Sequence, residues 1–154
     1  MSYTICGLSP ASFDHLLHAS DDELARHGAL RMTADARWCF PCRVTLDDAE
    51  IGETLILTNH ISHDDGPYRA SHAIFVSESA SEPAQYVDSV PPALGRRVLS
   101  VRAFGPDGLM TDAALAQPGE ADGVFRRMFE DPAVDHLDAH NAIRGCFAAR
   151  VERS

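Results

Sequence analysis

The sequence predicts an α+β domain with a mainly antiparallel β-sheet and three or four helices, two of them near the N-terminus. A length of 154 residues suits one domain, which we expect to span residues 1–154. Short segments in which apolar and polar residues alternate predict strands, and glycine-containing turns late in the chain join such segments into antiparallel hairpins. Helical spacing of apolar residues occurs near the start and between the two hairpins.

Two helices and a strand are expected before residue 35. Residues 9–18 begin with Ser-Pro, and proline at the first helical position favours a helix over this range. Ser20 and Glu23 form a capping box for a second helix, which Gly28 ends. Residues 30–34 alternate as a short strand.

The middle of the chain is predicted to contain strands joined by polar loops. Alternation over residues 42–46 indicates a half-buried strand, and the apolar residues 55–57 indicate a buried one. A polar loop over residues 59–72 leads to a strand at 73–77. Residues 77–93, rich in Ser, Glu and Pro, are expected to form the longest exposed loop.

A first hairpin is expected from strands at 98–104 and 109–115. The turn between them, Gly-Pro-Asp-Gly at 105–108, has proline where φ is preset and glycine where φ must be positive. A three-residue loop gives a register that pairs Leu99 with Leu115, Val101 with Ala113, and Arg102 with Asp112.

A helix over residues 120–130, stopped by Asp131-Pro132, precedes a second hairpin of strands 134–142 and 146–151. With Gly145 left-handed in its turn, one face of this hairpin is apolar. That face carries Leu137, Ala139, Asn141, Phe147, Ala149 and Val151. The polar face pairs Asp138 with Arg150 and His136 with Glu152, which are opposite charges when the histidine is protonated.

The composition excludes several classes of function. A net charge of −10 argues against nucleic acid and anionic membranes as partners. All 13 basic residues are arginine, so a phosphate-binding loop with its lysine and a lysine Schiff base, including that of pyridoxal phosphate, are excluded. No apolar run is long enough for a membrane helix, and residues 1–20 lack the pattern of a secretion signal, so we expect a cytoplasmic protein.

The four cysteines suggest thiols or ligands rather than a disulfide framework. Cys39 and Cys42 have the spacing of a redox dithiol, but neither a buried strand before them nor a helix after them is expected. A zinc site could combine these two thiols with His140 and Cys146, although no zinc or other cofactor is required by the sequence. A second candidate metal cluster consists of His60, His63, Asp64, Asp65 and His72.

Two further sets of residues could form a functional site. His140, Asn141 and Cys146 are the residue types of a cysteine-hydrolase triad, but the predicted register places Asn141 and His140 on opposite faces. Arginine guanidinium groups suit carboxylate or phosphate, and nearby hydroxyl and imidazole groups can complete an anion pocket. The residues proposed for such a pocket are Arg43, Arg69 and Arg144, with Tyr68, Ser71 and His140, and Asn141 beside them.

Four motifs in order resemble a bacterial family known as domain of unknown function 1203. They are Pro41-Cys42-Arg43; Pro67-Tyr68-Arg69-Ala70-Ser71 with Ile74-Phe75-Val76; Leu99-Ser100-Val101-Arg102-Ala103; and His140-Asn141-Ala142 with Arg144-Gly145-Cys146-Phe147-Ala148-Ala149-Arg150. Cys39 and His72 depart from the family's usual pattern. The resemblance implies a single domain and draws attention to Cys42, Arg43, Tyr68, Arg69, His140, Asn141, Arg144 and Cys146, but it implies no activity.

Three functional hypotheses follow. The first is a binding module or enzyme for a small anionic molecule that uses the arginine pocket. The second is a thiol- or zinc-dependent enzyme centred on Cys42, Cys146 and His140. The third is a structural or protein-interaction domain that uses the 77–93 loop.

Overall fold

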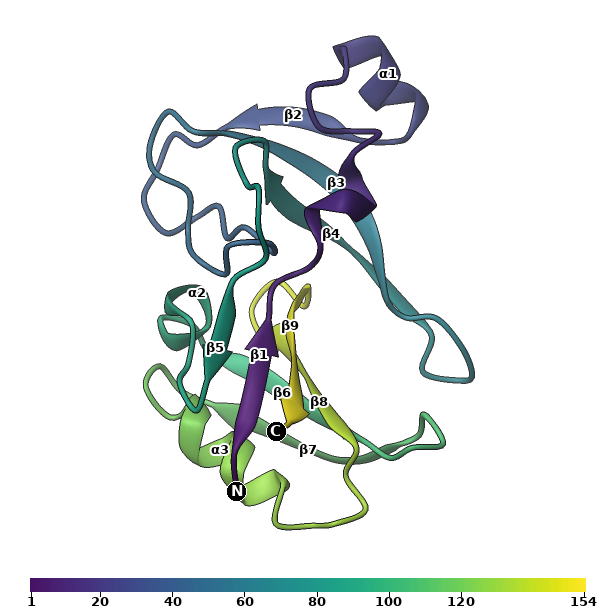
Figure 1. The fold of residues 1–154 in the computed structure, drawn as a ribbon, viewed down its shortest axis with the longest axis vertical. Helices are drawn as coiled ribbons and strands as arrows, with labels where there is room; N and C mark the ends of the chain where they lie inside the picture. Colours follow the sequence, from purple (N-terminus) through teal and green to yellow (C-terminus); the bar gives the residue numbers. More distant parts are fainter.

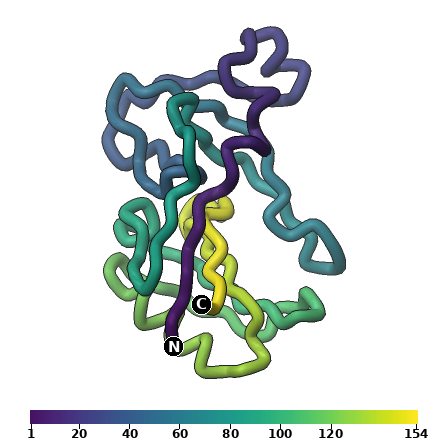
Figure 2. Tube along the Cα trace, in the orientation of Figure 1, coloured from purple at the N-terminus to yellow at the C-terminus, as the bar shows by residue number.

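The computed structural model describes all 154 residues and contains two antiparallel sheets, which confirms the predicted α+β fold (Figure 1). The strands are β1 (Tyr3–Cys6), β2 (Leu30–Thr33), β3 (Thr54–His63), β4 (Ala70–Ser77), β5 (Gln85–Val87), β6 (Leu99–Phe104), β7 (Met110–Ala116), β8 (His136–Asn141) and β9 (Phe147–Arg153). Six of them form one sheet in the order β5-β1-β9-β8-β6-β7, and β2-β3-β4 form the other. Both chain ends lie together, because β1 pairs with β9 (Figure 2).

Three short α-helices accompany the sheets: α1 (Asp21–Arg26), α2 (Pro92–Gly95) and α3 (Ala121–Met128). The predicted capping box of α1 is confirmed. The predicted helix over residues 9–18 is wrong, since only a 3₁₀ turn forms at Pro10–Phe13. The segment that follows closes with His18 at φ 62°, a left-handed conformation that no helix of L-residues can continue. None of the helices is long and apolar enough to cross a membrane.

The main hydrophobic core lies between α3 and one face of the six-stranded sheet. Phe125 of α3 is fully buried and meets the ring of Tyr3 edge-on at 5.6 Å. Alternate residues of the central strands, among them Val101 and Leu137, are also fully buried in this core. Because side chains alternate along a strand, the intervening residues of β6, β8 and β9 point to the opposite face.

The β6–β7 hairpin forms, but the predicted register is wrong by one residue. Arg102 lies opposite Ala113 instead of Asp112, and Leu99 lies opposite Ala116. The pairing shifts between Ala103 and Phe104, beside a turn in which Gly108 has φ 76°. The irregularity inserts one extra residue into β7, which the predicted register did not include. Arg102 and Asp112 are therefore not cross-strand partners, and the expected ion pair is lost.

The predicted strand over residues 42–46 is also wrong. The chain turns back on itself there, with the Leu46 amide donating to the Cys42 carbonyl at 3.0 Å and Leu46 at φ 56°. The apolar residues of the pattern are buried as expected, but Arg43 between them is buried too. Alternation therefore identified the buried residues and not the local structure, because a tight turn places both kinds of side chain inside.

The segments predicted as loops contain more strand than expected. Most of the polar segment 59–72 belongs to the β3–β4 hairpin, which pairs Asn59 with Ala73 and continues to His63. The histidines of this segment do not indicate a loop, because they face the other sheet. The 77–93 segment contains β5 and the start of α2, and β5 pairs with β1, a strand the sequence did not predict.

The β8–β9 hairpin has the predicted register over most of its length. Asp138 lies opposite Arg150, His136 lies opposite Glu152, and Gly145 has the expected positive φ of 81°. The register shifts after Ala139. As a result His140 lies opposite Phe147, so the predicted placement of Phe147 on the apolar face is wrong.

The outer face of the six-stranded sheet, opposite α3, is polar and aromatic. The β3–β4 hairpin lies across it (Figure 1), with β4 in contact with β9. Histidines of the hairpin meet rings of the larger sheet along this interface: His60 with Phe147 at 5.5 Å, His72 with His140 at 5.0 Å, and His63 with Phe104 at 4.7 Å. This inter-sheet interface is where the candidate site lies.

Candidate functional site

Cys146 lies in the turn between β8 and β9, at one end of the inter-sheet interface. The turn is closed by the Gly145 amide, which donates to the Asn141 carbonyl at 2.6 Å. The Cys146 sulfur, which is half-buried, accepts hydrogen bonds from Nη2 of Arg43 at 3.2 Å and from Nδ2 of Asn141 at 3.4 Å. Two N–H donors, one of them cationic, therefore point at a single sulfur.

Arg43 reaches Cys146 from the tight turn at residues 41–48 and is only 2% exposed. Its Nε donates to the Phe147 carbonyl at 2.7 Å, and its Nη1 donates to the Pro41 carbonyl. No carboxylate contacts the guanidinium. Burial lowers the pKa of Arg43, and the Cys146 side chain opposes this effect. Since arginine stays charged in proteins, the site contains a buried cation.

The N-terminal segment holds this turn in place. The Leu8 amide donates to the Arg43 carbonyl at 2.8 Å. Gly7 passes so close that a Cβ at this position would lie 1.9 Å from the Val44 carbonyl oxygen, a distance no side chain permits. The close approach requires glycine, and it fixes the turn from which Arg43 extends.

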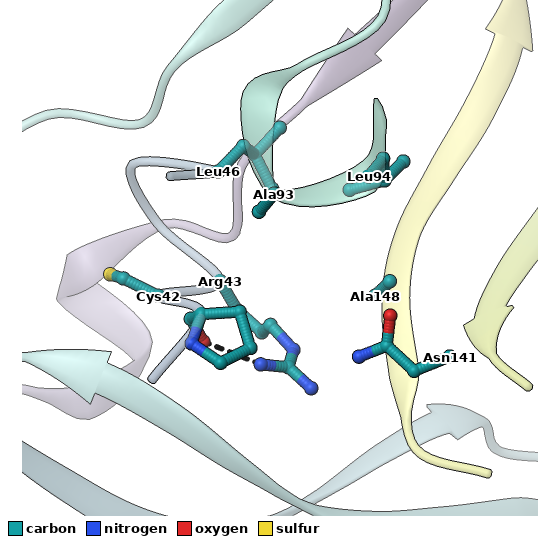
Figure 3. Close-up of a pocket in the computed structure, with 8 residues that line it drawn as sticks. Cys42, Arg43, Leu46, Ala93, Leu94, Asn141 and Ala148 are labelled. Carbon is teal, nitrogen blue, oxygen red and sulfur yellow. Dashed lines mark hydrogen bonds between the residues drawn. The ribbon is translucent and has the colours of Figure 1, made fainter. Parts of the chain in front are cut away.

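A small cavity of about 10 Å³ lies beside Arg43, Asn141 and Ala148 (Figure 3). It has room for about one water molecule. Asn141 Oδ1 is buried without a hydrogen-bond partner, and its side chain points toward the guanidinium of Arg43 in Figure 3. Cys42 points away from the guanidinium, and its sulfur accepts from the Ser77 amide at 3.3 Å. Cys42 is therefore a buried packing residue.

His140 does not contact the thiol. Its Nδ1 is 3.1 Å from the Gly145 carbonyl, and its ring meets His72 and Phe147 between the sheets. Burial lowers the pKa of His140 to about 4, although the bond to Gly145 opposes the change. Burial lowers the pKa of His60 and of His72 as well. These imidazoles are neutral at pH 7, and the arrangement is not that of a hydrolase triad.

The other residues of the predicted anion pocket lie apart. Arg69 and Ser71 are exposed at the turn end of the β3–β4 hairpin, where Tyr68 meets Phe104 edge-on at 5.9 Å. Arg144 is exposed in the β8–β9 turn, beyond the opposite end of β8. The six residues of β8 separate these ends by roughly 17 Å. The structure therefore brings together Arg43, Asn141 and Cys146, and leaves Arg69 far from them.

The predicted metal sets are not assembled either. The only three His, Cys, Asp or Glu side chains whose ligand atoms all lie within 4.8 Å of one another are His63, His136 and Asp138. Cys39 is exposed and belongs to no such group, and no helix follows the Cys-x-x-Cys pair. Of the predicted histidine cluster only His63 belongs to this group. His136 and Asp138 were predicted only as paired residues of the second hairpin.

These features define an α+β domain of two antiparallel sheets with a buried arginine beside a half-buried thiol. The chain belongs to DUF1203, a family of proteins of unknown function, whose model matches residues 39–153. The match includes Arg43, Asn141 and Cys146 but excludes β1, α1 and β2. No curated protein and no solved structure matches the chain.

Proposed function

We propose that the protein is a thiol-dependent enzyme in which Cys146 is the nucleophile and the substrate is small and anionic. The observation that supports this most directly is the contact between the buried guanidinium of Arg43 and the sulfur of Cys146, at 3.2 Å. Cysteine nucleophiles react as thiolates, and a neighbouring cation favours the thiolate.

The partners of Arg43 single out Cys146 as the residue that can balance its charge. A buried cation without a counter-charge is costly, and buried charges in proteins are normally paired. The other acceptors of Arg43 are the carbonyls of Pro41 and Phe147, which carry no net charge. Among its hydrogen-bond partners only Cys146 can ionise, so a thiolate at this position offsets the charge of Arg43.

The surrounding residues then have distinct roles. Asn141 donates to the sulfur and fixes its position, while the buried Arg43 places a positive charge beside the sulfur. Arg144, exposed two residues before Cys146, is placed to attract an anionic substrate. His140 bonds to the Gly145 carbonyl and not to the thiol, so the groups that contact the sulfur are the donors Arg43 and Asn141 and not a general base.

A binding pocket that uses Arg43 directly is less well supported. Three of its five N–H groups donate within the protein, and the side chain is only 2% exposed, so little of the guanidinium can reach a ligand. Of the arginines expected to bind an anion, only Arg144 is proposed to select a charged substrate.

Alkylation rates test this proposal. We expect Cys146 to react with iodoacetamide at pH 7 faster than Cys6 and Cys39, although those two are more exposed. We also expect anionic iodoacetate to be favoured at Cys146, and Arg144→Gln to reduce that preference by roughly threefold, the effect of one charge a few ångströms away in water. Mass spectrometry of the intact protein after timed labelling gives the rate at each thiol.

Arg69→Gln is the matched control, since Arg69 is also exposed but lies at the far end of β8. The distance between Arg69 and Cys146 exceeds the Debye length of about 10 Å at 0.1 M salt, so Arg69→Gln should leave the iodoacetate preference of Cys146 unchanged. Labelling of Cys146 that is slower than that of both exposed cysteines would contradict the proposed thiolate. An unchanged preference in Arg144→Gln would contradict the proposed substrate charge.

A further inference from the structure

Three potential metal ligands from both sheets meet at the end of β8 opposite Cys146. His63 ends β3, whereas His136 and Asp138 are two residues apart on β8 and so point to the same side. One ligand-type atom from each lies within 4.8 Å of the other two. Imidazole nitrogen and carboxylate oxygen are ligands that divalent transition metals share.

His136 is oriented as metal-binding histidines are. Its Nδ1 is 3.0 Å from a carboxylate oxygen of Asp135, a contact that fixes the proton on Nδ1. The opposite nitrogen, Nε2, then presents a lone pair. This atom is buried and has no hydrogen-bond partner in the protein. Metal-binding histidines characteristically donate the other ring N–H to a carboxylate or carbonyl, so the unpaired Nε2 is the expected ligand atom.

Asp138 is held in a fixed orientation. Its side chain is 1% exposed, and its two oxygens accept from Nε and Nη2 of Arg150 at 2.8 and 3.0 Å. Arg150 Nη2 also donates to the carbonyl of Ser62, the residue before His63, at 3.0 Å. A carboxylate has about four lone-pair positions, so two remain for a cation. Arg150 thus joins the two strands that supply the ligands.

Aromatic rings and backbone hold both imidazoles in place. Phe104 stacks on His63 at 4.7 Å and on His136 at 5.4 Å. The β6–β7 turn also packs on His63, since a Cβ at Gly108 would lie 3.5 Å from its Nε2. The ligand side chains are therefore positioned before any metal binds, and this reduces the cost of ordering them.

We propose that His63, His136 and Asp138 bind a divalent transition-metal ion of the Zn²⁺ class. Two histidines and one carboxylate form the ligand set of many catalytic zinc sites and of non-haem iron sites, and they leave a coordination position open for water or substrate. The site is separate from the Cys146 thiol, because His136 and Asp138 lie five and three residues before Asn141 along β8, which corresponds to roughly 17 and 10 Å.

Calorimetric titration of the chelator-stripped full chain with Zn²⁺, in a non-chelating reductant, tests the site. We expect one equivalent to bind. His63→Ala should weaken binding at least about 100-fold, because loss of an outer-shell partner alone typically costs 10- to 100-fold. Asp135→Asn, which alters an exposed residue and leaves the ligands intact, should weaken binding roughly 10-fold.

Cys146→Ser and His15→Ala are the controls for binding at a thiol and at an exposed histidine. Both should bind Zn²⁺ as the unaltered chain does. Thermal unfolding of each variant with chelator present shows whether it is folded. Absence of a one-equivalent site in the unaltered chain would overturn the proposal, and so would loss of binding in Cys146→Ser with retention in His63→Ala. Neither result depends on whether Cys146 is a nucleophile.

Discussion

Replacing Arg43 by methionine is expected to lower the free energy of unfolding by roughly 3–5 kcal/mol. The substitution keeps much of the side-chain volume but removes every donor. The carbonyls of Pro41 and Phe147 are then left buried without a partner, at about 1–3 kcal/mol each. For a chain of this size such a loss corresponds to a fall in Tm of roughly 6–20 °C.

Urea unfolding measured by circular dichroism tests this expectation. Arg127→Met is the matched control, because Arg127 is exposed on α3 and makes no side-chain hydrogen bond. Its unfolding midpoint should stay close to that of the unaltered chain. Equal midpoints for Arg43→Met and Arg127→Met would mean that the bonds from the guanidinium to Pro41 and Phe147 do not contribute to stability.

A double-mutant cycle separates the ion pair from the carbonyl bonds. Cys146→Ala alone leaves Arg43 without its ionisable partner, so it should destabilise the chain, whereas the same change in the Arg43→Met background should cost less. We expect a coupling energy of about 1 kcal/mol or more between the two positions. Additive effects would show that the sulfur does not interact with the cation, and would remove the main support for a thiolate.

The elements that were predicted correctly bury one face and are stabilised by residues that are close in sequence. The β8–β9 hairpin and its register up to Ala139 were predictable because apolar alternation on one face and opposite charges on the other agree. The capping box of α1 and the helix α3 have equally local causes. In each case the neighbours that stabilise the element are close in sequence.

Errors occurred where partners distant in sequence decide the structure. The 42–46 segment forms a turn because Arg43 bonds to Phe147, a residue more than a hundred positions away. The histidine-rich part of β3 appeared to be a loop because the polar sheet face that it covers is formed by strands much later in the chain. Local alternation contains no information on either contact.

The candidate sites show the same limit. Asn141 and Cys146 are near neighbours in one turn, and the sequence placed both among the possible site residues. Their contact with Arg43 was not predictable, because it depends on how the two sheets pack. The His136-x-Asp138 spacing on a predicted strand was an available indication of a shared ligand face, but its third member, His63, comes from the other sheet.

The stability of the protein is expected to fall as pH decreases from 6.5 to 4, and His140 is the largest identifiable histidine contribution. Burial lowers the pKa of His140 from 6.5 to about 4. Within this window the unfolded chain binds a proton that the native protein does not, so acid favours unfolding. The contribution is fully present above pH 6.5 and is lost toward pH 4, with an upper value of about 3 kcal/mol.

The groups that face His140 act in both directions. Arg102 and His72 add to the lowering of its pKa, whereas Asp138 and the Gly145 carbonyl oppose it. Burial also lowers the pKa of His60 and of His72, and these two histidines contribute to the acid sensitivity with the same sign. Acid should therefore first loosen the inter-sheet interface, where all three imidazoles lie.

Urea unfolding of the His140→Asn variant between pH 4.5 and 7.5, with chelator present, isolates this effect. The asparagine amide can still donate to the Gly145 carbonyl but does not titrate, so the variant should lose less stability on acidification, by up to about 1.4 kcal/mol per pH unit near pH 5. His15→Asn, at an exposed histidine, should show the unaltered pH dependence. Parallel curves for His140→Asn and the unaltered chain would mean that His140 accepts a proton as readily in the folded protein as in the unfolded chain.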